Sequence, residues 1–310
     1  MAFSPAEQDG GAPLAIHGLC IVKNEADVIA HTLRAAALWC DHIYVFDNGS
    51  EDETWDIVRD LASELPAVVP FKQDARPFTD SLRGEILRYY KSRAGEADWW
   101  AVIDADEFYI DDPRAFLAAV PDRFRAVWPQ LYSFVFTDVD ADAWRQEPGR
   151  YASDIPLTER LHHYVLGDYT EVRFFRHDPA LSEVPDLRPI YPERIRVRHY
   201  GYRSPEQIGV RLRTRREPMQ RGEFIHEKRS NWLPGGDAAP GPAVEADMPR
   251  GWQERIVPHG ECYVDSGVDS LMPPKPWVPP ESVAQPRLFW RRQRGLRSVI
   301  DRILHLPQPV

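Results

Sequence analysis

The sequence predicts an α/β fold in which a mainly parallel sheet forms the centre of the chain. Short apolar segments alternate with amphipathic helical segments over residues 15–110, which is typical of strands joined by helical crossovers. Ligands of such sheets bind at the carboxyl ends of the strands. Polar residues directly follow two of the apolar segments, at "DNGS" (47–50) and "DADE" (104–107), so these stretches mark the predicted functional edge.

Four strands are predicted in this region, each from a short apolar run. They cover residues 15–22, 42–47, 67–73 and 99–104. Pro70 lacks the N–H that a central strand needs, so the third strand is expected at an edge or a bulge. Helices are predicted between the strands over residues 25–39, after a capping box formed by Ser50 and Glu53, and over residues 78–94.

Beyond residue 108 the pattern is looser. Asp112 precedes Pro113 as an N-cap precedes a proline at the first helical position, so a helix is predicted there. Strands are predicted over residues 126–140 and 171–177, and a further helix is predicted to begin with a cap at Ser204.

Composition excludes several classes of protein. The 310 residues carry a net charge of −10 with a pI of about 5.5, which argues against a general nucleic-acid binder. Cys20, Cys40 and Cys262 are scattered, so neither a disulfide framework nor a thiolate zinc site is indicated. The first residues lack the pattern of a signal peptide and no apolar run is long enough to span a membrane. A soluble cytoplasmic protein is therefore expected.

The stretch "WWAVIDADEF" places a group of carboxylates directly after a buried strand. Like charges at close range raise one another's pKa and destabilise the group unless a cation lies among them. A divalent metal is the obvious candidate, because Mg²⁺ and Mn²⁺ prefer hard carboxylate oxygens. A D-x-D sequence can also be an ordinary solvated turn or helix cap.

Other site types fit the residues less well. In haloacid-dehalogenase-like phosphatases the D-x-D ends the first strand and is followed by Thr or Val, whereas here the strand is the fourth and Phe108 takes that place. Neither a dinucleotide-binding glycine motif nor a P-loop follows the first strand, since "IVKNEADVI" contains no glycine.

Three ordered motifs, "CIVKNEADVIAHTL", "VFDNGSEDET" and "WWAVIDADEF", resemble family-2-type glycosyltransferases of the A-type, Rossmann-like nucleotide-binding fold. The resemblance is closest to the subgroup whose first strand ends in K/R-N-E, and it covers residues 15–110. It implies metal-dependent transfer of a sugar from a nucleoside-diphosphate sugar to an acceptor hydroxyl, with inversion. The alternatives are a catalytically inactive nucleotide-sugar-binding protein of the same fold, or a nucleotidyltransferase or phosphatase.

The resemblance also assigns roles to particular residues. Asp106 is expected to hold manganese or magnesium, and Asp104 to face the ribose or the metal. His199, at the end of a predicted strand, is the expected distal metal ligand, although a structural histidine explains it equally well.

The donor nucleotide is expected at the first two strand ends, which place Asn24, Glu25 and Asp47 around it. Asp47 ends a buried strand, where its carboxylate needs a hydrogen-bond donor such as a base N–H. Arg83 is expected to contact the diphosphate, although it can equally be a surface arginine. The helix predicted after Ser204 carries four arginines, which form either a phosphate-binding patch or a solvated face. They are Arg211, Arg213, Arg215 and Arg216.

An inverting transferase needs a base for the acceptor hydroxyl. Asp138 is the first candidate, because the strand before it is expected to run beside the D-x-D strand and to end near it. Glu171 is the second, although Arg173 and Arg176 are expected to hold it in a structural ion pair; Asp140 and Asp168 are further candidates.

The predicted organisation has four parts. They are a disordered or loosely packed N-terminus (1–14), a glycosyltransferase domain (15–230) with a nucleotide-binding half (15–110) and an acceptor half (111–230), a Pro/Gly-rich excursion (231–286), and a basic amphipathic C-terminal helix (287–310). This helix is expected to contact the inner face of an anionic membrane, where a lipid-linked acceptor would lie. Docking on its own domain or on a second subunit of a homodimer is the alternative, and a saccharide is the alternative acceptor.

Overall fold

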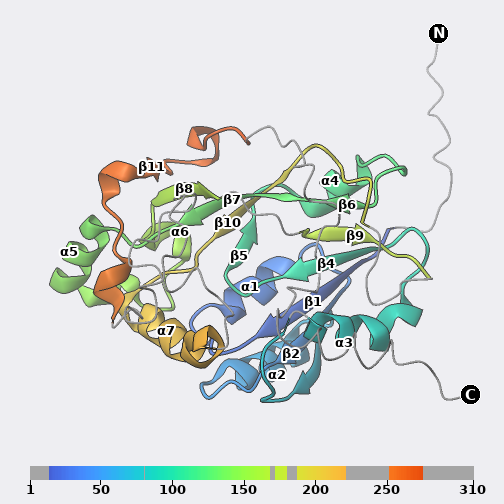
Figure 1. Cartoon of the computed structure of the whole chain (residues 1–310), viewed down its shortest axis with the longest axis horizontal. Helices are drawn as coiled ribbons and strands as arrows, with labels where there is room; N and C mark the ends of the chain where they lie inside the picture. The colour runs from blue at the N-terminus through green and yellow to red at the C-terminus, as the bar shows by residue number, and fades with distance from the viewer. Residues whose placement is uncertain (1–13, 80, 168–171, 180–186, 221–250, 275–310) are drawn as a thin grey trace, which may run out of the picture.

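Two β-sheets organise the chain in this computed structural model, which describes residues 14–79, 81–167, 172–179, 187–220 and 251–274. The strands are β1 (Ile16–Val22), β2 (His42–Asp47), β3 (Val68–Gln73), β4 (Trp99–Ile103), β5 (Glu107–Tyr109), β6 (Ala126–Val127), β7 (Pro129–Phe134), β8 (His163–Gly167), β9 (Phe174–Arg176), β10 (Ile195–His199) and β11 (Tyr263–Val264). One sheet has the order β3-β2-β1-β4-β9-β6, and the other has the order β11-β8-β7-β10-β5 (Figure 1).

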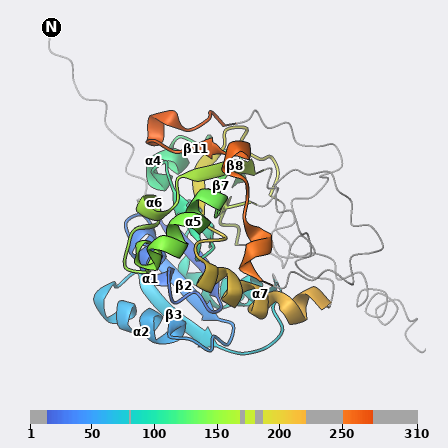
Figure 2. The same ribbon diagram turned by 90° about the vertical axis from the view of Figure 1, so that its left-hand side faces the viewer.

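The helices lie mostly between consecutive strands, as the alternating pattern predicted. They are α1 (Ile29–Ala36), α2 (Thr54–Glu64), α3 (Ser81–Tyr90), α4 (Pro113–Ala118), α5 (Asp138–Gln146), α6 (Leu157–Arg160) and α7 (Pro205–Gln220). Short 3-10 turns are η1 (Lys91–Arg93), η2 (Pro148–Tyr151), η4 (Trp252–Arg255), η5 (His259–Glu261) and η6 (Val268–Ser270). Figure 2 shows α5 and α7 on the side of the molecule that faces the viewer.

The first four strands are parallel, which confirms the predicted α/β fold with a mainly parallel central sheet. β1 pairs with β2 and β4, and β2 pairs with β3, all in parallel, whereas β9 is antiparallel to both β4 and β6. β3 lies at the edge, and its register shifts immediately after Pro70, as the missing N–H predicted.

The side chains of each central strand alternate between two apolar layers. Cys20 and Val45 pack with residues of α1 and α2, such as Leu33 and Val58. Leu19, Tyr44 and Trp100 point the other way and pack with α3 through Leu82 and Ile86. Helices therefore cover both faces of this sheet, and the strand ends are left as the open edge.

Two predicted local structures are wrong. Ser50 does not cap α2: its hydroxyl accepts from the Asn24 N–H at 2.9 Å, and Asp52 accepts from the Thr54 N–H at 3.0 Å. The predicted strand 126–140 ends at Phe134, and Thr137 starts α5 with a capping box to Asp140. A serine hydroxyl can accept a hydrogen bond from more than one nearby backbone N–H. Here Ser50 accepts from Asn24 in the turn after β1, and not from the first turn of α2.

Candidate functional site

Four acids and four arginines meet where β1 and β4 end and β5 begins. We call this set the acid–arginine cluster; its members are Glu25, Asp104, Asp106, Glu107, Arg83, Arg173, Arg203 and Arg211. The acids come from the predicted strand ends, whereas the arginines come from α3, from the residue before β9, from the segment after β10 and from α7. The carboxylates that the sequence placed together are therefore balanced by cations from distant parts of the chain.

Asp104 lies between two arginines. Arg83 Nη2 donates to its Oδ1 at 2.5 Å, and Arg173 Nη2 donates to its Oδ2 at 3.1 Å. Burial favours the neutral acid, but these two guanidinium groups prevail and hold the pKa of Asp104 below its usual value. Arg83 therefore pairs with the D-x-D segment, and its expected contact with the diphosphate stays a prediction.

Glu107 forms a two-pronged ion pair with Arg173, whose Nε and Nη2 donate to it at 2.8 and 2.6 Å. Only 4% of the Glu107 side chain and 2% of the Arg173 side chain are exposed. Burial raises the pKa of Glu107, and the charge of Arg173 opposes this. The sequence had suggested Glu171 as the partner of Arg173; Glu171 lies outside the described residues, and Arg173 pairs with the D-x-D segment.

Asp106 faces His199 and two arginines through its Oδ2 atom. His199 Nε2 lies 3.5 Å away, Arg211 Nη1 donates at 3.0 Å, and Arg203 Nη1 lies 4.0 Å away. Burial would raise the pKa of Asp106, but these neighbours hold it well below its usual range. The antiparallel pairing of β5 with β10 sets His199 opposite Glu107, which explains why these distant residues meet.

The Asp106–His199 pair is the part of the site that fits a metal. Within the described residues no three His, Cys, Asp or Glu side chains form a metal-binding group. Mg²⁺ in phosphate-binding sites is usually held by one or two carboxylates together with substrate phosphates. A carboxylate beside an imidazole therefore fits a metal that is completed by the donor diphosphate. Asp104 fits that role less well, because both of its oxygens accept from arginines, whereas the contacts of Asp106 described above all involve Oδ2.

Arg203 joins the turn after β1 to the segment before α7. Its side chain is fully buried and donates to Glu25 at 2.6 Å and to Asp27 at 2.7 and 2.9 Å. Asn24, with a φ of 55°, donates from Nδ2 to Thr214 Oγ1 at 2.9 Å. The K-N-E motif thus ties the first strand to α7, a role that its sequence did not reveal.

Asp47, at the end of β2, is completely buried. Its Oδ1 accepts from the N–H groups of Gly49 and Ser50 and from Gln73 at 2.8 to 3.2 Å. Its Oδ2 is buried and accepts no hydrogen bond from any described residue. A buried carboxylate oxygen without a hydrogen-bond donor destabilises the fold. Asp47 Oδ2 therefore still lacks the partner that the sequence suggested it needs.

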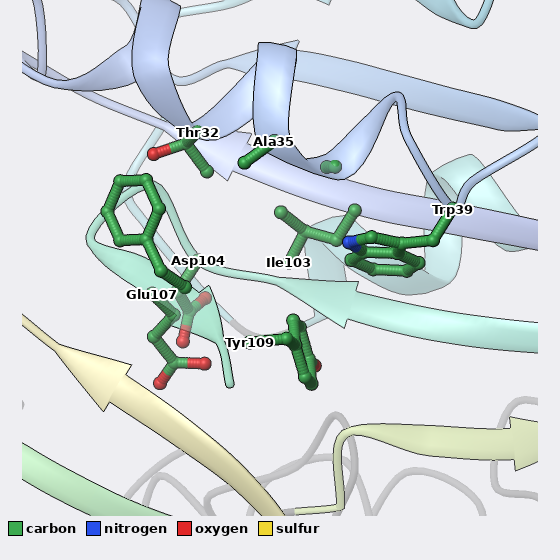
Figure 3. A pocket seen from close by; sticks show the side chains of 9 residues that line it. Thr32, Ala35, Trp39, Ile103, Asp104, Glu107 and Tyr109 are labelled. Carbon is green, nitrogen blue, oxygen red and sulfur yellow. The ribbon is translucent and has the colours of Figure 1, made fainter. Parts of the chain in front are cut away.

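A narrow pocket lies behind the D-x-D segment, between α1 and β5 (Figure 3). Asp104 and Glu107 form its polar side, and Trp39, Ile103 and Tyr109 form its apolar side. Thr32 closes it with a short hydrogen bond to the Ala105 carbonyl. The pocket belongs to the wall that holds the acid–arginine cluster in place.

Asp138 lies in a different setting from the one expected. It begins α5, half exposed, and its carboxylate accepts from the N–H of His259 at 2.8 Å and lies 3.0 Å from His259 Nδ1. The strand before it, β7, pairs with β8 and β10 in the second sheet, so the expected position beside the D-x-D strand is wrong.

The predicted C-terminal helix 287–310 lies outside the described residues, and none of the helices described here could cross a membrane.

Residues 19–163 match the family model of glycosyl transferase family 2. The match covers just under half of the chain and includes the K-N-E, D-N-G-S and D-A-D-E-F segments. It supports a family-2 glycosyltransferase domain in this part of the chain. No curated protein matches the chain.

Solved structures resemble the chain only distantly. A mannosyltransferase from Pyrobaculum calidifontis, in complex with GDP-Man and Mn²⁺, is 18% identical with a TM-score of 0.30, over 40% of this chain and 39% of that one. Glucosyl-3-phosphoglycerate synthase from Mycobacterium tuberculosis, with Mn²⁺ and UDP, is 16% identical with a TM-score of 0.24, over 48% and 55%.

A third structure belongs to another class of enzyme. A putative glucose-1-phosphate thymidylyltransferase from Bacillus anthracis is 17% identical with a TM-score of 0.28, over 39% and 56%. The chain thus spans between about two fifths and little more than half of these proteins' lengths. Similarities this low carry no argument about activity.

Proposed function

We propose that this protein is a metal-dependent glycosyltransferase that moves a sugar from a nucleoside-diphosphate sugar to an acceptor hydroxyl with inversion. The observation that carries the proposal is the Asp106–His199 pair, 3.5 Å apart and surrounded by arginines at the open edge of a parallel sheet. The family match over residues 19–163 supports the same reaction class.

Asp47 and the turn after β1 would hold the nucleoside. The free Oδ2 of Asp47 is suited to accept a base N–H, because every other contact of this carboxylate ends on Oδ1. Asn24 and Glu25 follow the neighbouring strand and are fixed by Thr214 and Arg203. Side chains that are fixed in this way before a ligand binds lose little entropy on binding.

The diphosphate would lie against Asp106, His199 and the arginines of the cluster. A divalent metal bound there would act as a Lewis acid on the phosphate oxygens while negative charge develops on the leaving group. Arg83 and Arg211 would add fixed positive charge on the same edge, a role that their ion pairs with the aspartates of the D-x-D segment support.

The base is proposed to be Asp138 or Glu171. The half-exposed Asp138 is oriented by His259, which would keep its carboxylate ionised and fixed. General base catalysis contributes roughly 10²–10⁴-fold, so Asp138→Asn should lower transfer by about 100-fold or more with donor binding unchanged. Normal transfer by Asp138→Asn together with an inactive but folded Glu171→Gln would assign the base to Glu171.

Thermal shift with UDP or GDP, with and without Mn²⁺, tests the proposal. A ligand at about 100 times its dissociation constant adds about 2.7 kcal/mol to the free energy of unfolding. Asp106→Asn should lose most of the Mn²⁺-dependent increment, whereas Asp142→Asn, at an exposed surface ion pair, should keep it. An equal increment in both variants would contradict the metal assignment. Donor hydrolysis in the presence of Mn²⁺ separates an active transferase from an inactive binding protein.

A further inference from the structure

A solvent-open cleft lies beside the acid–arginine cluster, between the turn after β1, the segment after η2 and the start of α7. Its cavity volume is about 360 Å³, which is within the size range of small-molecule sites. Asp27, Tyr151, Ala152, Arg160 and Gln207 are among the residues that line it. Asn24, which the proposed nucleoside site also uses, lines it as well, and the other lining residues have no role in that site.

Arg160 is the unusual residue of this cleft. Only 4% of it is exposed, and its Nη1 donates to the Tyr151 carbonyl at 3.0 Å. Its Nε and Nη2 atoms are buried and donate to no described residue. Leaving the N–H donors of a buried guanidinium unpaired lowers stability. A ligand of the cleft that offers hydrogen-bond acceptors to Arg160 is therefore favoured.

Three of the other polar side chains of the cleft are carboxylates, which only accept hydrogen bonds when ionised. Asp27 lines it and is fixed by the two-pronged contact with Arg203, while each of its oxygens can accept a further hydrogen bond. Two more carboxylates, Asp52 and Glu206, also line the cleft. Three carboxylates disfavour a phosphate or another anion, whereas a hydroxyl group can accept from Arg160 and donate to Asp27 at once.

The apolar part of the lining suits the carbon face of a sugar ring. Tyr151 directs its hydroxyl to Asp140 at 3.1 Å, so the phenol group is already satisfied. Ala152 and Val210 add apolar surface. Apolar walls with a few fixed polar groups are typical of small-molecule sites.

We propose that this cleft is the acceptor subsite and that it binds a neutral saccharide through Arg160 and Asp27. The inference rests on the proposed glycosyltransferase function. Arg203 connects the two sites, because one guanidinium binds Asp27 in the cleft and lies 4.0 Å from Asp106 in the cluster. A saccharide in the cleft would therefore lie one side chain away from the proposed metal site.

Binding of methyl glucoside, methyl mannoside and methyl galactoside, followed by saturation-transfer NMR, tests the proposal. The unaltered protein should bind at least one of them, and Ala152→Trp should abolish binding because the indole fills the cleft from its exposed rim. Arg160→Lys keeps the charge but loses the planar donors, and should weaken binding about 10- to 100-fold. Ala118→Trp on α4 and Arg150→Lys, both exposed and outside the cleft, are the matched controls.

Three results would overturn the proposal. They are no glycoside binding by the unaltered protein, glycoside binding by Ala152→Trp at the original affinity, and binding of inorganic phosphate that depends on Arg160 in place of glycoside binding. UDP and GDP binding with Mn²⁺ is measured separately on the unaltered protein. A failure of the proposed function appears in that measurement, and a failure of the acceptor subsite appears only with the glycosides.

Discussion

Replacing Arg173 with methionine is expected to lower the free energy of unfolding by about 3–5 kcal/mol, the usual result of removing one partner of a buried ion pair. The hydrogen bonds of Arg173 to described residues include two to Glu107 and one to Asp104, all of them charge-assisted. The Arg173 and Glu107 side chains are only 2% and 4% exposed, so water cannot replace the lost donors. Asp104 keeps Arg83 at 2.5 Å, so most of the loss should come from Glu107.

Urea denaturation measures this loss. With a slope of about 3 kcal/mol per M, the midpoint should fall by about 1–2 M. Arg34→Met is the matched control, because Arg34 also pairs with a glutamate at 2.9 Å but both side chains are more than half exposed. Such surface pairs contribute about 0–1 kcal/mol, so this control should be nearly unaffected.

A second substitution tests the cause. Adding Glu107→Gln to Arg173→Met removes the uncompensated charge, and should restore at least half of the lost free energy of unfolding. Equal midpoints for Arg173→Met and Arg34→Met would refute the reasoning. So would a double variant whose loss is the sum of the two single losses.

Three further predictions concern the candidate site and the core. Asp47→Asn should weaken binding of UDP or GDP about tenfold in calorimetry at an unchanged melting temperature, because the amide nitrogen cannot accept a base N–H; unchanged affinity would argue against Asp47 as the base-binding group. Gly201→Ala should reduce the Mn²⁺-dependent part of nucleotide binding, since the new Cβ would lie 3.1 Å from Cε1 and 3.3 Å from Nε2 of His199; binding that responds to Mn²⁺ as before would contradict a role for His199. Burial lowers the pKa of His17 below 6.5, although Asp98 opposes this. The unfolded chain then binds a proton at higher pH than the folded protein, so the free energy of unfolding should decrease as the pH falls below about 6.5. Urea titrations at several pH values should show a shallower decrease for His17→Phe.

The strands and their ends could be predicted from the sequence because they depend on local patterns. β2 was predicted to the residue, β1 and β4 to within one residue, and Pro70 placed β3 at the edge. The same local reasoning led to Asp47, Asp104 and Asp106, since an acid directly after a buried strand is unusual wherever that strand lies.

The partners of these acids could not be predicted in the same way. Arg173 meets acids 66 and 69 positions away, and Arg203 meets acids 176 and 178 positions away. No spacing rule links such residues, and an arginine before a strand or a helix is typical of the protein surface. The error at Asp138 had a related cause: a threonine cap ended the apolar run, and the strand before it joined the second sheet.

The contact between Arg203 and the turn after β1 also bears on how the chain is synthesised. Glu25 leaves the ribosome far earlier than Arg203, and until then the first strands carry acids that they cannot bury without a cation. Residues 15–110 should therefore not form a closed unit during translation, although they contain most of the parallel sheet. Ribosome-bound chains stopped before residue 203 should remain sensitive to protease in this region, and chains extended beyond Arg211 should become resistant.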